Sequence, residues 1–419
     1  MDHTAAPAAA GPDPAPPPMP PGRIFLRFLR FGLLAWGGPV AQIAMLRREL
    51  VDEERWMAGG RFNRLLAVFQ VLPGPEAHEL CVHFGMMRGR RLGGFLAGLG
   101  FMLPGFVLMF ALSWLYFRMD IAGSALAPVF LGVQVGVIAL IVRAVHRIGG
   151  HVLMDPWLWA LAAAGAGLTL FGASFWIVLP AAGVLYGLLH QRRYAWAAVA
   201  LVVAAATVVL LSPLAWPELA AASASAAPGP SAAVKDVSAA ALFLSGLKAG
   251  LLTFGGAYTV IPFLRDDAVG RGWMSESQFL DGVALSGVLP APLIIFSTFV
   301  GYAAGGPLGA LAMTAGIFLP AFSFSLLLFD RLEGLVDNKG LHAFLEGVSA
   351  GVVGLIAATT LELAAAVAGR LPSILPGLLI FGLALAVLYL WKSKLNILLM
   401  LAGAGCAGWL VFAAGGPNP

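Results

Sequence analysis

The stretch Leu72-Pro73-Gly74-Pro75 lies inside strongly apolar sequence, and Leu289-Pro290-Ala291-Pro292 lies in the same setting in the second half of the chain. Two companion elements keep nearly the same spacing: Gly37-Gly38-Pro39 is matched by Gly255-Gly256-Ala257, and Arg55-Trp56-Met57 by Gly272-Trp273-Met274. A register that holds over such a distance indicates an internal repeat. In a membrane protein, Gly and Pro at matched positions of two halves are typical of broken helices that form a transport site.

The composition excludes an ordinary soluble protein. Of the 419 residues, 60% are hydrophobic and 11% are charged, whereas about a quarter of a soluble domain is charged. We therefore expect an all-α polytopic membrane protein with about thirteen transmembrane spans and the lipid bilayer as its surroundings. We expect neither an enzyme nor a nucleic-acid partner, and no cofactor. The two cysteines, Cys81 and Cys406, are too few for a disulfide framework.

The distribution of apolar runs divides the chain into four parts. Residues 1–22 are rich in Ala and Pro and predict a disordered cytoplasmic tail. Residues 23–212 form the first transmembrane repeat, with seven spans. Residues 213–240, rich in Ala, Ser and Pro, form an extracytoplasmic linker. Residues 241–413 form the second repeat, with six spans.

Arginine and lysine in the short loops predict the orientation, because these residues favour the cytoplasmic side. Most of them, including Arg88–Arg91 and the pair Arg265 and Arg271, fall on one side if the N-terminus is cytoplasmic and the C-terminus is outside. An odd number of spans in the first half makes the repeats inverted. The segment 46–61 breaks the pattern, since its four arginines would then lie outside. An interfacial helix there is the alternative placement.

Several of these elements carry a family resemblance. The run from Phe31-Gly32 to Pro39, Arg55-Trp56-Met57, Gln70–Pro75 and Gly100–Pro104 together resemble the chromate ion transporter family. The second copy, from Thr253-Phe254-Gly255-Gly256 to Pro290-Ala291-Pro292, is similar to the second domain of the long, two-domain members. The resemblance covers 23–413. It implies export of chromate across the bacterial inner membrane, driven by the proton gradient.

A chromate site needs hydrogen-bond donors and positive potential, because chromate is a tetrahedral dianion. The N-terminus of a half-helix supplies both, so we predict substrate binding at the breaks. A proline that only kinks a helix for packing is the alternative at each break. For the glycine pairs, close approach to a ligand and small-residue helix packing are equally open. The predicted residues are Gly37, Gly38, Gly74, Pro75, Gly255, Gly256, Pro290, Ala291 and Pro292. Because Ala291 replaces Gly74 and Ala257 replaces Pro39, we expect the two half-sites to differ.

Two cations, Arg30 and Lys248, sit at matched positions of the two copies inside apolar sequence. An ionisable group inside a span is a functional candidate, and a matched pair of cations suits a dianion. We therefore predict Arg30 and Lys248 as substrate ligands. The alternative is that these side chains reach along their helices to the membrane interface.

A polar cluster follows the first Pro-Gly-Pro element. Carboxylate and imidazole groups can relay protons, so we predict proton coupling at Glu76, His78 and Glu79. Glu346 and Glu362 are weaker candidates. For Glu76 the alternative role is to cap the half-helix, which favours a negative charge at its N-terminus.

The same cluster supports a rival function. The spacings of His78 with Cys81 and of Glu79 with His83 place side chains on one helix face, and such groups bind transition metals. A divalent-metal transporter is therefore an alternative, although the second copy has no matching ligands and we expect no resident metal. Transport of another oxyanion such as sulfate also stays open, as does assembly into a homodimer.

Overall fold

The chain is almost wholly helical in the computed structural model, which describes residues 17–119, 126–211, 237–254, 256–329, 339–391, 393 and 395–413. No strand occurs in these ranges, which confirms the all-α prediction. Most of the expected tail at 1–22 and most of the expected linker at 213–240 lie outside the described residues, as does Gly255. The boundaries of these two segments therefore stay predictions.

The first repeat begins with four short helical segments and one long helix. In chain order these are α1 (Pro21–Leu33), α2 (Gly38–Leu46), the π-helical segment η1 (Arg47–Glu53), α3 (Gly59–Val71) and the long α4 (Glu76–Arg118). The backbone of α4 leaves helical geometry at Gly89 and Arg90 and reverses there. Gly85 and Gly93 then approach so closely that a Cβ atom on either would lie 2.4 Å from the carbonyl oxygen of the other. The two arms of α4 are thus antiparallel and closely packed.

The second repeat reproduces this arrangement. Its elements are α10 (Ala239–Leu251), η3 (Ala257–Val260), α11 (Ile261–Ala268), α12 (Glu276–Gly287), η4 (Leu293–Ile295) and α13 (Phe296–Leu328). α13 reverses at Gly305 and Gly306, which match the reversal in α4. The backbone angles agree closely, with φ 52° and ψ −151° at Arg90 and φ 59° and ψ −150° at Gly306. The repeat found in the sequence is therefore also a structural repeat.

Longer helices complete each copy. The first continues through α5 (Ala127–Val152), α6 (Pro156–Leu170), α7 (Phe175–His190) and α8 (Tyr194–Leu211), and the second through α15 (Lys339–Ala368), α16 (Ile374–Leu390) and α17 (Asn396–Phe412). Among the described residues, α4, α5, α13 and α15 are long and apolar enough to cross a membrane, and several shorter apolar helices accompany them. The protein is thus a polytopic membrane protein.

The two repeats are inverted with respect to each other. The long arms of α4 and α13 pack side by side, with Gly94 against Leu326 and Gly98 against Phe322. As the residue number rises along α4, the number of the contacted residue in α13 falls. These equivalent arms therefore run in opposite directions. This antiparallel pairing confirms the predicted inversion.

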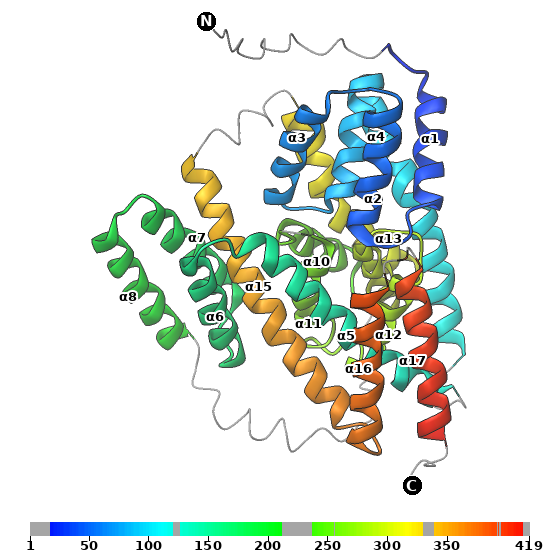
Figure 1. Cartoon of the computed structure of the whole chain (residues 1–419), viewed down its shortest axis with the longest axis vertical. Helices are drawn as coiled ribbons and strands as arrows, with labels where there is room; N and C mark the ends of the chain where they lie inside the picture. The colour runs from blue at the N-terminus through cyan, green and yellow to red at the C-terminus, as the bar shows by residue number, and fades with distance from the viewer. Residues whose placement is uncertain are drawn as a thin grey trace, which may run out of the picture.

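The copies also exchange their C-terminal helices. α5 of the first repeat packs on α16 and α17 of the second, whereas α15 of the second packs on α6 and α7 of the first. In Figure 1 α15 accordingly crosses the middle of the molecule and reaches the bundle of α6, α7 and α8 at one side. Glycines make these contacts close: a Cβ on Gly132 would overlap Ala404, and one on Gly347 would overlap Ala182.

The first two expected spans of each half are not single spans. Phe62 stacks on Phe84 with ring centroids 6.3 Å apart, although a continuous helix between them would rise about 33 Å. Phe279 likewise packs on Phe296 at 5.4 Å. The stretches near 62–87 and 278–303 are therefore helical hairpins. Those near 24–45 and 241–262 also fold back, because Arg30 in α1 meets Glu49 in η1 and Ser245 in α10 meets Asp267 in α11.

These hairpins correct the predicted placement of two loops. The ring of Trp56 lies under the guanidinium of Arg88, 4.2 Å away, so the segment 46–61 lies on the same face as Arg88 and not on the other one. Arg265 and Arg271, by contrast, return to the side of Gly306, because α10 packs there against the reversal of α13. The error has one cause: a hairpin that enters and leaves on one face looks like a span in hydropathy alone.

The molecule has two faces, the arginine face and the opposite face. The arginine face carries Pro21, Trp56 and Arg88. It also carries Val152, because the chain crosses to the opposite face along α4 and returns along α5. The opposite face carries Arg118, Gly306 and Ala368. The long arm of α4, 91–118, is about 42 Å long, which exceeds the roughly 30 Å of hydrocarbon in a bilayer.

Candidate functional site

A cavity of about 310 Å³ lies between the two repeats. Its walls come from α2, α3, the start of α4, α5 and α15, together with the residues around Tyr258. It opens on the arginine face, where His151 lies in the last turn of α5, Met154 follows that helix and His342 stands near the start of α15. Its lining is rich in titratable groups for a membrane protein, namely Glu76, Arg147, His151, Tyr258, His342 and Glu346.

The inner end of the cavity is the meeting point of the helix breaks. A small pocket beside it is lined by Pro39, Pro75, Ala257 and Pro292, and Glu76 lines both spaces. The breaks also contact each other directly, since the Gly74 N–H donates a hydrogen bond of 2.8 Å to the carbonyl of Thr253. All four Gly/Pro elements found in the sequence therefore converge on one place.

The glycines at the breaks are required by the backbone. Gly37 and Gly38 have φ of 92° and 79°, Gly74 has 149° and Gly256 has 122°, and residues other than glycine rarely adopt such values. A Cβ added to Gly38 would meet nothing within 4 Å. Close helix packing is thus not the reason for Gly38. Its backbone conformation turns the chain from α1 into α2.

Two helices begin at the breaks with no side-chain cap. α2 starts at Gly38 and α4 at Glu76, and no side chain accepts a hydrogen bond from their first turns. The first amides of a helix lack intrahelical partners, and the helix dipole adds positive potential at that end. Glu76 is the first residue of α4 and is 9% exposed, so its carboxylate lies where this potential and the cavity meet.

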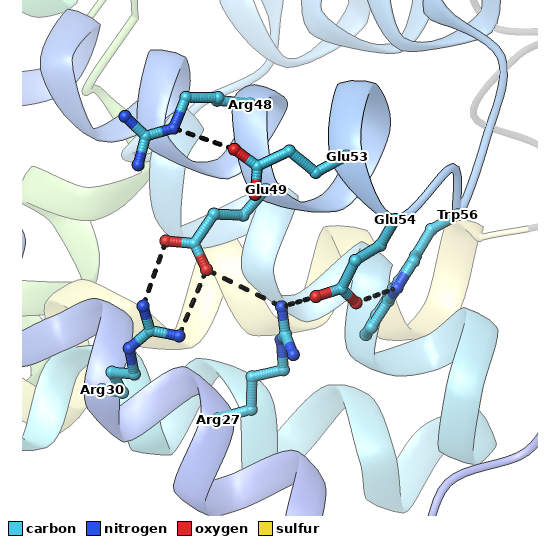
Figure 2. Close-up of polar contacts among 7 residues, drawn as sticks. All are labelled: Arg27, Arg30, Arg48, Glu49, Glu53, Glu54 and Trp56. Atoms are coloured by element: carbon cyan, nitrogen blue, oxygen red, sulfur yellow. Dashed lines mark hydrogen bonds and ion pairs between the residues drawn. The ribbon is translucent and has the colours of Figure 1, made fainter.

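The structure gives Arg30 a carboxylate partner. Its guanidinium approaches both oxygens of Glu49 at 3.3 and 3.5 Å, and Arg27 lies between Glu49 and Glu54, as Figure 2 shows. The same cluster holds the indole of Trp56, which donates to Glu54 at 2.8 Å. This network ties α1 to η1 within the first hairpin.

Lys248 is paired in the same way. Its Nζ lies 2.7 Å from the carboxylate of Asp267, which is fully buried. The same carboxylate accepts a hydrogen bond from the Ser245 hydroxyl and forms an ion pair with Arg271. Asp267 is the counterpart of Glu49, in the same register that relates Lys248 to Arg30. Neither cation lines the cavity. Both ion pairs close a hairpin, and the role of Arg30 and Lys248 as ligands of the dianion stays a prediction.

The cation that does line the cavity is Arg147. It lies in α5, near the end of the helix, and shares the cavity lining with Glu76 and Tyr258. Among the described residues it makes no hydrogen bond and no ion pair within 4 Å. In the sequence Arg147 looks like one of the loop arginines after the fourth span. Its spacing from His151, one helical turn, was the available signal that both could face one space.

The predicted proton-coupling residues occupy different surroundings. Glu76 lines the cavity. Glu79 is fully buried, and neither of its carboxylate oxygens has a hydrogen-bond partner among the described residues. A Cβ on Gly74 would lie 2.8 Å from Oε1 of Glu79, so this carboxyl group sits against the Pro-Gly-Pro break. His78 is also fully buried and packs against Phe318 and Phe322 of α13.

The ligands of the metal alternative do not gather. His83 lies between the rings of Phe69 and Phe329, and Cys81 is fully buried. Within the described parts of the chain, no group of three His, Cys, Asp or Glu side chains is placed to hold a metal ion. The spacing that suggested a metal site is a helix periodicity that here serves packing.

The two weaker candidates lie on opposite faces. Glu346 lines the cavity and pairs with His342 one turn away, at 3.2 Å. Glu362 lies toward the other end of α15, where it binds Arg265, and Arg265 also binds Glu276 at 2.7 Å. These ion pairs join α11, α12 and α15.

Two inverted repeats of broken helices around a polar cavity define this chain as a polytopic membrane transporter. It belongs to the chromate transporter family, whose model matches residues 22–188 and 240–409. A chromate transport protein of Pseudomonas aeruginosa is 63% identical over 399 residues, which cover 95% of this chain and 94% of that protein. A chromate transport protein of Cupriavidus metallidurans is 30% identical over 402 residues, 93% of each chain. No solved structure matches the chain.

Proposed function

We propose that the protein is a secondary transporter that exports chromate, or a closely related tetrahedral oxyanion, across the bacterial inner membrane. The observation that carries this proposal is the cavity that runs from the arginine face to the convergence of the helix breaks of both repeats. Half-helix N-termini and a cation at the repeat interface suit an anionic substrate. The printed names of the two relatives support chromate in particular.

The assignment of the faces supports export as the direction of transport. The arginine face gathers the arginines of 46–61 and Arg88–Arg91, and the positive-inside rule therefore supports a cytoplasmic arginine face and a cytoplasmic N-terminus. The cavity is then open to the cytoplasm, ready to load substrate for export. The membrane potential, which is part of the proton gradient's driving force, favours the exit of a dianion by about 4.6 kcal/mol per 100 mV, at about 2.3 per elementary charge.

Proton coupling is assigned to Glu76 and Glu79, with His78 beside them. Glu76 faces the cavity near Arg147, so its negative charge competes with an entering anion for the same cation. Glu79 is enclosed without a partner among the described residues, and a carboxyl group in that setting is far less costly when it carries a proton. A proton that moves between solvent and these groups therefore changes the charge that the substrate meets.

Transport into everted membrane vesicles tests this function. Vesicles that contain the protein should accumulate radiolabelled chromate, and a protonophore should reduce the uptake. Sulfate in excess should compete, because it shares the charge and shape of chromate, whereas divalent cations should not. Vesicles from cells that lack the protein are the control.

The outcomes separate the alternatives. Uptake of chromate that is insensitive to the protonophore would remove the proton coupling but keep the transporter. Accumulation of a divalent metal in place of chromate would support the rival function. No uptake of any oxyanion would refute the proposal.

A further inference from the structure

Arg147 stands out among the charged side chains of the protein by what surrounds it. It lines the cavity at the level of Glu76 and Tyr258 and has no ion pair within the described residues, whereas Arg30 and Lys248 each have a carboxylate within 3.3 Å. Arg147 is an exposed side chain near the end of α5, so its guanidinium is accessible to a ligand that enters the cavity. An anion that enters the cavity can therefore pair with Arg147 in competition with Glu76.

The other charged groups around the cavity do not fill this role. Glu346 is paired with His342 across one turn of α15. Arg143, one turn before Arg147 in α5, adds a second positive charge and does not line the cavity. Glu76 is the remaining carboxylate, and no hydrogen bond or ion pair joins it to Arg147 among the described residues. Arg147 is thus the arginine in the cavity lining, and its guanidinium donors are available to an anion.

The fold itself does not require a cation at this position. Residue 362 in α15 occupies the place of residue 147 in the other repeat, in the register that also aligns Gly132 and Gly136 with Gly347 and Gly351. That residue is a glutamate. Since the same structural position accepts either charge, packing does not explain the guanidinium of Arg147.

We infer that Arg147 is the residue that recognises the negative charge of the oxyanion. This inference rests on the proposed function and names the ligand of that site. A planar guanidinium can donate two parallel hydrogen bonds to two oxygens of a tetrahedral oxyanion, which an ammonium group cannot. The uncapped N-termini of α2 and α4 lie at the inner end of the same cavity and complete the donors around the anion.

The test compares Arg147→Gln and Arg147→Lys with the wild type in reconstituted proteoliposomes, by the dependence of initial chromate uptake on its concentration. Arg147→Gln should raise KM about 10- to 100-fold, the range for loss of a hydrogen bond between charged groups. Arg147→Lys should raise KM less, because it keeps the positive charge but cannot donate two parallel hydrogen bonds. Arg143→Gln is the matched comparison, one turn away and outside the cavity lining. It removes a nearby charge but no donor that lines the cavity, so it should raise KM clearly less than Arg147→Gln does.

The outcomes distinguish this inference from the function on which it rests. Wild-type KM in Arg147→Gln, with chromate still transported, would overturn the role of Arg147 and keep the function. No transport by the wild-type protein would overturn both. If Arg147→Gln is lost from the membrane, KM of the folded Arg147→Lys protein decides: a value equal to the wild type contradicts recognition by the guanidinium fork.

Discussion

Arg147 and Glu362 hold the same position in the two repeats and carry opposite charges. On the arginine face, Arg147 lies beside an open cavity with no carboxylate bound to it among the described residues. On the opposite face, Glu362 binds Arg265, which also binds Glu276 at the start of α12. Ion pairs thus bridge α11, α12 and α15 at the position that corresponds to the cavity of the first copy.

The comparison shows how two copies of one architecture can present different surfaces to the two sides of a membrane. Arg47, the counterpart of Arg265 in the first copy, is exposed and contacts Asn63 rather than a residue of α5. On the arginine face the two counterparts, Arg47 and Arg147, are both cations, and the helices stay apart. On the opposite face Arg265 meets carboxylates, and the helices are joined. In an inverted repeat, exchange of these two arrangements is the expected route to alternating access.

The largest effect should come from giving the second repeat the charge of the first. Glu362→Arg removes one partner of Arg265 and adds a like charge, so the bridge on the opposite face should open. Ala366, the counterpart of His151, can report this as Ala366→Cys in a Cys406→Ser background. A membrane-impermeant thiol reagent should label it at least about tenfold faster with Glu362→Arg, because a lost charged hydrogen bond is worth about 1.5–3 kcal/mol.

Two controls accompany that measurement. Ala366→Cys with Glu362 intact gives the basal rate, and Glu362→Asp, which keeps the charge, should stay close to it. An unchanged labelling rate in Glu362→Arg would mean that these ion pairs do not close the opposite face, and the comparison of the two sides would lose its basis.

A second comparison concerns Gly74 and Ala291, which hold the same place in the two Pro-x-Pro breaks. Gly74→Ala should cost about 1–3 kcal/mol for its backbone conformation, in addition to the overlap with Glu79 at 2.8 Å. Ala291→Gly should cost only about 1 kcal/mol for a lost methyl contact, because Ala291 is not at positive φ. Thermal unfolding in detergent and chromate uptake would measure both. Equal stability of the two variants would contradict the asymmetry of the breaks.

The smallest effects should distinguish the two ion-paired cations. Lys248→Gln leaves the fully buried Asp267 short of one partner and should cost about 1–3 kcal/mol, whereas Arg30 is 60% exposed and Arg30→Gln should cost at most about 1 kcal/mol. If Lys248 serves only the hairpin, Lys248→Gln combined with Asp267→Asn should regain transport. Loss of transport in the double variant, with normal stability, would instead support Lys248 as a substrate ligand.

The sequence predicted the breaks well because their causes are local. Proline removes a backbone donor and glycine permits positive φ, so α3 ends at Val71 and α12 at Gly287, each shortly before its Pro-x-Pro element. The odd number of spans counted in the first half also predicted the inversion. The hairpins were missed, because the hydropathy of 62–87 does not tell whether a broken helix continues or turns back. That choice depends on contacts such as Phe62 with Phe84.

The candidate site was predicted in part for the same reason. Gly38, Gly74 and Pro75 lie where they were expected, since their positions follow from the breaks. The sequence did not show that both predicted cations have carboxylate partners. Arg30 and Lys248 looked unpaired in sequence because their partners, Glu49 and Asp267, lie well beyond the next helix break, at the same spacing in both copies. Arg147 looked like an ordinary loop residue because the cavity wall that it faces comes from other helices.

The sequence by itself thus determined that the chain is a helical membrane protein of two matched, inverted copies, and where their helices must break. These properties reside in composition, in local backbone chemistry and in a register that can be counted along the chain. Only the tertiary structure decided which way each broken helix turns, which copy's helices pack on which, and which arginine is left to face a cavity. Those outcomes depend on contacts between residues far apart in the chain. Whether a charged side chain has a partner is decided by the residues that pack against it in the folded protein.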